Sequence, residues 1–67
     1  MTLEHLAAQY PGWRLWHSRT GGLVCATRLR HLTEEELSAE LHMTLMADDL
    51  PALAEELHTQ TAREAAL

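Results

Sequence analysis

The chain has 67 residues, a formal net charge of −5 and a single cysteine, so we expect one small domain over residues 1–67. One cysteine excludes an internal disulfide and a zinc site with several thiolates from one chain, and it is typical of a cytoplasmic protein. No apolar run is long enough to cross a bilayer, and the N-terminus lacks the cationic start and apolar run of a secretory signal.

Residues 3–10 are predicted to form a short helix. Thr2 is placed to cap its start, and its apolar residues recur at helical spacing. Pro11 and Gly12 end it. Two helical turns are marginal alone, so this helix needs tertiary packing.

Residues 13–28 are predicted to form a β-hairpin with strands at 13–18 and 23–28. The segment "RTGG" between the strands supplies Gly21 and Gly22, which adopt the positive φ angles of tight turns at little cost. The hairpin holds both tryptophans of the chain, the cysteine and three of its five arginines.

Pairing Ser18 with Leu23 sets the register of the hairpin and divides its side chains between two faces. We expect the face with the better apolar continuity to meet the core; it holds Trp13, Leu15, His17, Val24, Ala26 and Arg28. The other face then holds Arg14, Trp16, Ser18, Leu23, Cys25 and Thr27.

The segment "LTEEEL" predicts a helix over residues 34–41. Thr33 and Glu36 have the spacing of a capping box, and Leu32 and Leu37 have the spacing of a hydrophobic staple. Residues 42–47 then have two interpretations. Their composition favours continuing the helix, whereas topology favours a third strand, because a lone hairpin is marginally stable. We adopt the strand.

The last segment, residues 49–65, is predicted to be a helix. Asp48 or Asp49 caps it, and Pro51 falls in its first turn, where a missing N–H is harmless. The sequence therefore predicts an α+β fold: a small antiparallel sheet packed by the three helices. The expected core consists of Trp13, Leu15, Val24, Ala26, Leu37, Leu53 and Leu57.

The order of these motifs resembles small uncharacterised actinobacterial proteins. The resemblance rests on "PGWRLW", a glycine-containing turn, "ATR" and "MTLMADDLPALAEEL", and it covers residues 3–60. In such proteins a tryptophan-bearing hairpin precedes a strand, an Ala-Asp step and a terminal helix. The resemblance implies the strand at 42–47 and no particular activity.

No catalytic or metal-binding pattern is evident. The five histidines lack the i, i+3 or i, i+4 spacing of helical metal ligands, so we expect no metal and no cofactor. Cys25 stands between Val24 and Ala26, where a cysteine usually behaves as a small buried apolar residue. A nucleophile would also need a cleft and an oxyanion site, which a chain this short rarely forms, so we expect a protein that is not an enzyme.

Charge is divided unevenly along the chain. Residues 1–31 carry four arginines and one glutamate, and residues 32–67 carry nine acids and one arginine. Opposite charges and a small core favour a protein–protein interaction module, as a homodimer or on a larger protein.

Nucleic-acid binding through the basic hairpin is the alternative. Both hypotheses use one set of partner-binding residues: Arg14, Trp16, Arg19, Arg28 and Arg30. An open patch of these arginines would favour nucleic acid, and arginines already paired with acidic residues would favour a protein partner.

Overall fold

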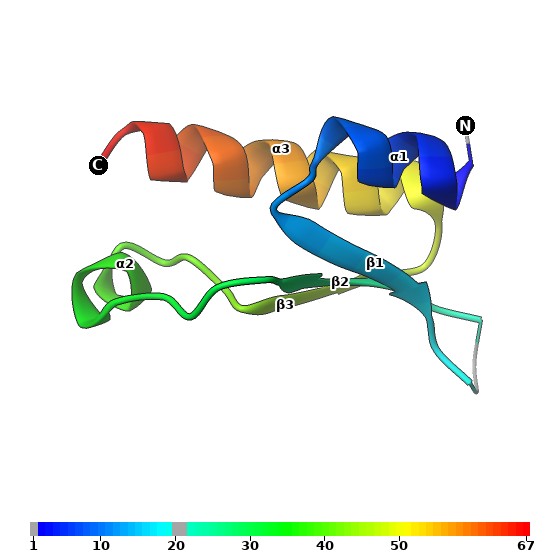
Figure 1. Cartoon of the computed structure of the whole chain (residues 1–67), viewed down its shortest axis with the longest axis horizontal. Helices are drawn as coiled ribbons and strands as arrows, with labels where there is room; N and C mark the ends of the chain where they lie inside the picture. Colours follow the sequence, from blue (N-terminus) through cyan, green and yellow to red (C-terminus); the bar gives the residue numbers. More distant parts are fainter. Residues whose placement is uncertain (1, 20–21) are drawn as a thin grey trace.

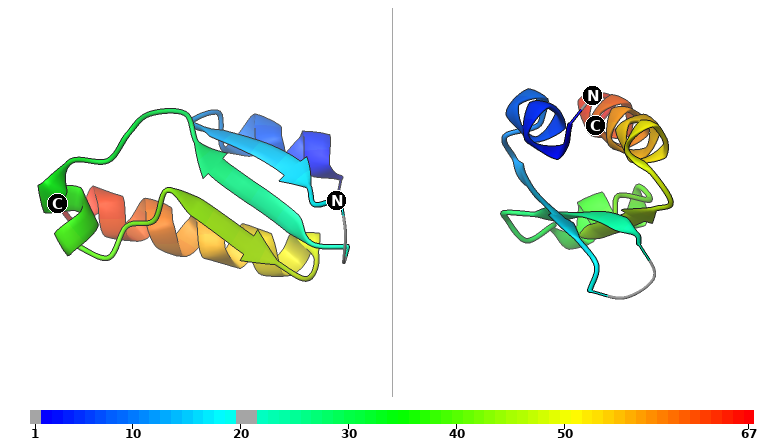
Figure 2. Two further views of the ribbon diagram at one scale, coloured as in Figure 1. Left: turned by 90° about the horizontal axis from the view of Figure 1, so that it is seen from below. Right: turned by 90° about the vertical axis from the view of Figure 1, so that its right-hand side faces the viewer.

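The computed structural model describes residues 2–19 and 22–67 and has an α+β fold. The elements run α1 (Leu3–Gln9), β1 (Trp13–His17), β2 (Val24–Arg28), α2 (Glu34–Ser38), β3 (Thr44–Ala47) and α3 (Leu50–Ala65). The strands form one antiparallel sheet in the order β1-β2-β3. Helices α1 and α3 lie side by side on one face of this sheet, and α2 lies beyond its end (Figures 1 and 2).

The hairpin has the predicted register. Trp13 pairs with Arg28 and His17 pairs with Val24, and the Ser18 amide donates to the Leu23 carbonyl at 2.9 Å. Gly22 has the expected positive φ of 65°. The predicted turn also includes Thr20 and Gly21, which lie outside the described residues.

The third strand is confirmed, over the shorter range Thr44–Ala47. It pairs antiparallel with β2, so that Leu45 lies beside Ala26 and Met46 lies beside Cys25. The central strand β2 therefore bonds to a neighbour on both edges. This pairing provides the third strand that a lone hairpin needs for stability.

The predicted caps of α1 and α3 are present. The Thr2 hydroxyl accepts from the His5 amide at 3.1 Å. Asp49, not Asp48, caps α3, and its carboxylate accepts from the Ala52 amide at 2.9 Å. None of the described helices is long and apolar enough to cross a membrane.

Helix α2 begins where the sequence predicts and ends earlier. Thr33 and Glu36 form the capping box, with both reciprocal bonds made, at 3.0 and 3.2 Å. The helix stops at Ser38, before the predicted end at residue 41. Glu40 adopts a φ of 65° and its amide donates to the Leu37 carbonyl, while the Leu41 amide donates to Glu36. These bonds form a Schellman motif, which reverses the chain toward β3.

The core lies between the sheet and the helices α1 and α3. Five of the expected core residues are buried there: Trp13, Val24, Ala26, Leu53 and Leu57. Leu15 is partly buried and packs against them. Leu6, Leu41 and Leu45 are also buried.

The prediction that Leu37 belongs to the core is wrong. Its side chain is 52% exposed. Because α2 has only five residues and lies beyond the end of the sheet, it has no layer to pack against. After the reversal at the end of α2, Leu41 turns inward and is 1% exposed.

Candidate interaction surface

The face of the sheet opposite α1 and α3 is not covered by any described helix (Figure 1). Side chains alternate between the faces of a strand, so register places one transverse row on this open face: Trp16 on β1, Cys25 on β2 and Met46 on β3. A second row holds Arg14, Thr27 and Thr44. We call this surface the open face.

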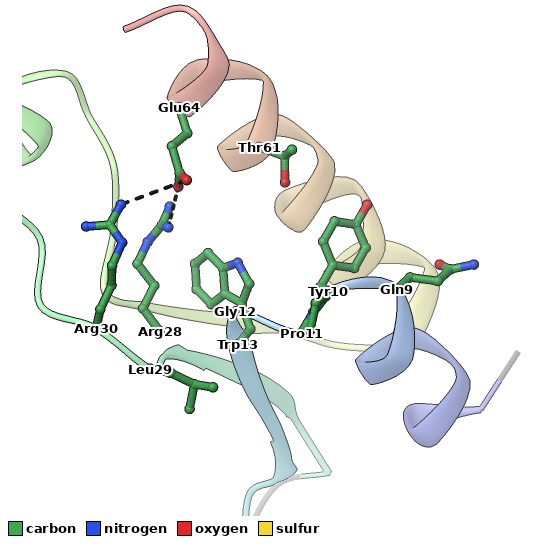
Figure 3. A pocket seen from close by; sticks show the side chains of 10 residues that line it. All are labelled: Gln9, Tyr10, Pro11, Gly12, Trp13, Arg28, Leu29, Arg30, Thr61 and Glu64. Atoms are coloured by element: carbon green, nitrogen blue, oxygen red, sulfur yellow. Dashed lines mark hydrogen bonds and ion pairs between the residues drawn. The ribbon is translucent and has the colours of Figure 1, made fainter.

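The open face extends past the end of β2 to Leu29. The Leu29 amide donates to the Gly12 carbonyl at 3.0 Å, which continues the ladder between the strands. Figure 3 shows the Leu29 side chain pointing away from α3. Leu29 is 66% exposed and Met46 is 63% exposed. Two of the largest exposed apolar side chains in the described chain therefore lie on one uncovered face.

Trp16 lies on β1, on this face. Its indole nitrogen donates to the Thr27 hydroxyl of the neighbouring strand at 3.1 Å. This bond ties the N–H edge of the indole to β2, and the side chain is partly buried. Cys25 is 1% exposed although no helix covers it, so its neighbours on the sheet shield the thiol. Cys25 is therefore a small packed residue in this fold.

Arg28 is the first of the predicted partner-binding residues that the structure places elsewhere. It is 7% exposed and lies on the core side of the sheet. Its guanidinium stacks on the Trp13 ring at 4.3 Å from the ring centre, and it forms an ion pair with Glu64. Nε donates to the His42 carbonyl at 2.8 Å and Nη2 donates to the Gln60 side chain at 3.1 Å. The prediction that Arg28 binds a partner is wrong, because its hydrogen bonds fasten α3 to the sheet.

Arg30 is exposed and already paired. Its two terminal nitrogens donate to the two carboxylate oxygens of Glu36 at 2.9 and 2.6 Å. The Arg30 side chain and the Thr33 amide together lower the pKa of Glu36 from 4.5 to about 2. The same hydrogen bond raises the pKa of Arg30. Arg30 therefore stabilises the first turn of α2, in which Glu36 lies.

Arg14 on β1 and Arg19, which follows the end of β1, remain exposed. Within residues 2–19 and 22–67, neither forms an ion pair. The four arginines of the hairpin region therefore do not form one open patch. Two are neutralised by acidic side chains, and only Arg14 shares the open face with Trp16.

A cavity of about 460 Å³ lies on the core side, between the end of α1 and the end of α3. Figure 3 shows Glu64 reaching from α3 toward Arg28 and Arg30, with Trp13 and Tyr10 beside them. The charged side chains that line this cavity, Arg28, Arg30 and Glu64, all form ion pairs within the chain. The cavity therefore offers no unpaired charged group to a ligand.

Gln60 is the buried polar residue that the sequence analysis missed. It is 1% exposed, and its side-chain oxygen accepts from the His42 amide at 2.8 Å and from Arg28. A signal was present, because Gln60 continues the apolar stripe of α3 three residues after Leu57. Met46 was also missed, since its exposure depends on which face of the sheet the helices cover.

In the described part of the chain, no three histidine, cysteine or acidic side chains lie close enough to hold a metal ion. No protein-family model, curated protein or solved structure matches this chain. The resemblance to small actinobacterial proteins stays a prediction.

Proposed function

We propose that this protein is a non-catalytic protein–protein interaction module that associates with itself through the open face of its sheet. One observation carries the proposal: in a two-layer fold, the outer face of the sheet keeps exposed apolar side chains. Met46 and Leu29 are each more than three-fifths exposed there, and Trp16 shares the row of Met46. Exposed large apolar side chains on one uncovered face are typical of an interaction site.

Trp16 has the properties of an interface anchor. Its hydrogen bond to Thr27 holds the indole in one orientation, so little conformational entropy is lost on binding. Tryptophan is among the side chains that contribute most to interface energies, commonly about 2 kcal/mol or more on truncation to alanine. The proposal gives the two tryptophans different roles: Trp13 packs in the core and Trp16 contacts the partner.

Electrostatics support a protein partner over nucleic acid. Contacts with phosphates supply most of the affinity of nucleic-acid binding. The buried Arg28 and the paired Arg30 cannot supply such contacts without breaking internal ion pairs. The remaining exposed arginines, Arg14 and Arg19, belong to a chain with a net charge of −5.

Sedimentation equilibrium over a micromolar concentration series tests the proposal. We expect the wild-type chain to reach the mass of a dimer. Trp16→Ala should keep its fold and raise the dimer dissociation constant by about 30-fold, which corresponds to about 2 kcal/mol. Leu37→Ala is the control, because it truncates an exposed apolar side chain that lies on α2, outside the open face.

A 7.6 kDa monomer at the highest concentration would overturn self-association. If that monomer also shifted DNA in a gel, with a steep salt dependence, nucleic-acid binding would replace it as the function.

A further inference from the structure

We infer that two copies associate face to face about a two-fold axis parallel to β2, so that Trp16 of each copy packs against Met46 of the other. This inference rests on the proposed function and specifies the geometry of the dimer. The strand β1 of one copy then lies over β3 of its partner, and the same contact occurs twice.

The shape of the central row supports this arrangement. Trp16 and Met46 lie at its two ends, on the edge strands, and the small Cys25 lies between them on β2. A two-fold axis along β2 exchanges the two ends of the row, so each indole meets the flexible thioether of the partner. Contacts between methionine sulfur and an aromatic ring are favourable. Leu29 continues the line of β2, so it lies near the axis and meets its own copy.

The charges on the two edges distinguish this axis from its main alternative. Arg14 lies on β1 and Arg19 follows its end, and both are exposed. Asp48 directly follows β3 and is exposed as well. An axis along β2 lays the edge with the two arginines over the partner's edge that carries Asp48. An axis across the strands would lay β1 over β1 and bring like charges together, which costs free energy.

The dimensions of the open face predict a weak dimer. In Figure 1 the sheet and helix layers are stacked vertically, so the side of the chain that holds the open face and α2 spans its longest and shortest dimensions, 32 and 17 Å. This outline is roughly 500 Å² per copy, so two copies bury at most on the order of 1,000 Å² in total, at the low end of specific interfaces. Both α1 and α3 lie on the far side and leave the face accessible.

A mixing experiment tests the Trp16–Met46 contact. Met46→Glu and Trp16→Arg each place a charge against an apolar partner in both contacts of the dimer. Each variant alone should weaken dimerisation by at least about 100-fold. Mixed in equal amounts, they should form a heterodimer, in which one contact pairs the introduced glutamate with the introduced arginine and the other keeps the natural pair. Circular dichroism confirms that each variant is folded.

A second variant does not depend on replacing Trp16. The proposed axis places Arg14 opposite the partner's Thr44, and both residues are exposed. Thr44→Glu should tighten the dimer by about 3- to 10-fold, through two new ion pairs at the rim. The gain should vanish in the double variant Arg14→Ala/Thr44→Glu. Leu37→Glu is the control for added charge outside the face and should leave the dissociation constant unchanged.

The outcomes separate the geometry from the proposed function. The proposed axis is wrong if the wild-type chain dimerises but the Met46→Glu and Trp16→Arg variants do not recover dimerisation on mixing. It is also wrong if Thr44→Glu leaves the dissociation constant of the dimer unchanged. Neither result contradicts self-association. A wild-type chain that stays monomeric overturns both.

Discussion

Replacing Gln60 by leucine isolates the energy of the buried polar cluster that joins α3 to the sheet. Leucine has a similar volume and suits the apolar stripe, so the cavity term is small. The substitution removes the acceptor of the His42 amide at 2.8 Å and of Arg28 Nη2 at 3.1 Å. It also removes the donor to the Glu40 carbonyl at 3.3 Å.

Each buried donor left without a partner costs about 1–3 kcal/mol, and more where it is charged. Because His42 is itself exposed and water can reach part of the cluster, we expect Gln60→Leu to lower the free energy of unfolding by about 3 kcal/mol. A chain of this length has a total of about 3–10 kcal/mol, so the loss is a large fraction of its stability.

Urea unfolding followed by circular dichroism measures this loss. His58→Leu is the matched control, since it adds the same side chain to an exposed position of α3. We expect the control to change the free energy of unfolding by less than about 0.5 kcal/mol. If Gln60→Leu leaves the free energy of unfolding unchanged or raises it, the buried hydrogen bonds of Gln60 do not stabilise the packing of α3 on the sheet.

Three further perturbations test single elements of the fold. Trp13→Ala should cost about 3–5 kcal/mol, because it removes a buried indole and the surface on which Arg28 stacks, and a thermal melt that still shows a native-like transition would contradict this. Thr33→Ala should cost about 1 kcal/mol through loss of the capping bond to Glu36, and an unchanged melting midpoint would show that α2 does not depend on its cap. Glu36 has a lower pKa in the folded chain than its ordinary value of 4.5, so its stabilising effect is complete above that pH and is lost as the pH falls through about 2. The acid transition of Glu36→Gln, measured from pH 5 to 2, should lack this part of the pH dependence, and identical acid profiles would mean that the ion pair with Arg30 contributes nothing.

Local chemistry explains why the elements of the fold were predictable. The capping box at Thr33 and the cap at Asp49 involve hydrogen bonds between residues three positions apart, so they can be recognised without tertiary information. The hairpin register followed from alternation and from a turn of known length, and the same argument placed Trp13 and Trp16 on opposite faces. The third strand needed a topological argument, because its composition favours a helix.

The sequence by itself therefore determined where the helices begin, to within one residue, how the hairpin pairs and which of its faces is apolar enough to form the core. Tertiary structure decided the burial of side chains whose environment depends on distant segments. Arg28 is buried because Gln60 and Glu64, which are 32 and 36 residues away in the sequence, form hydrogen bonds with its guanidinium. Leu37 is exposed and Leu41 buried because the chain reverses at Glu40. Both helices pack on the same face of the sheet, and that choice alone leaves Trp16 and Met46 on an open surface. The physical reason is range: caps and turns are set by neighbours along the chain, whereas burial is set by which surfaces the folded chain brings together.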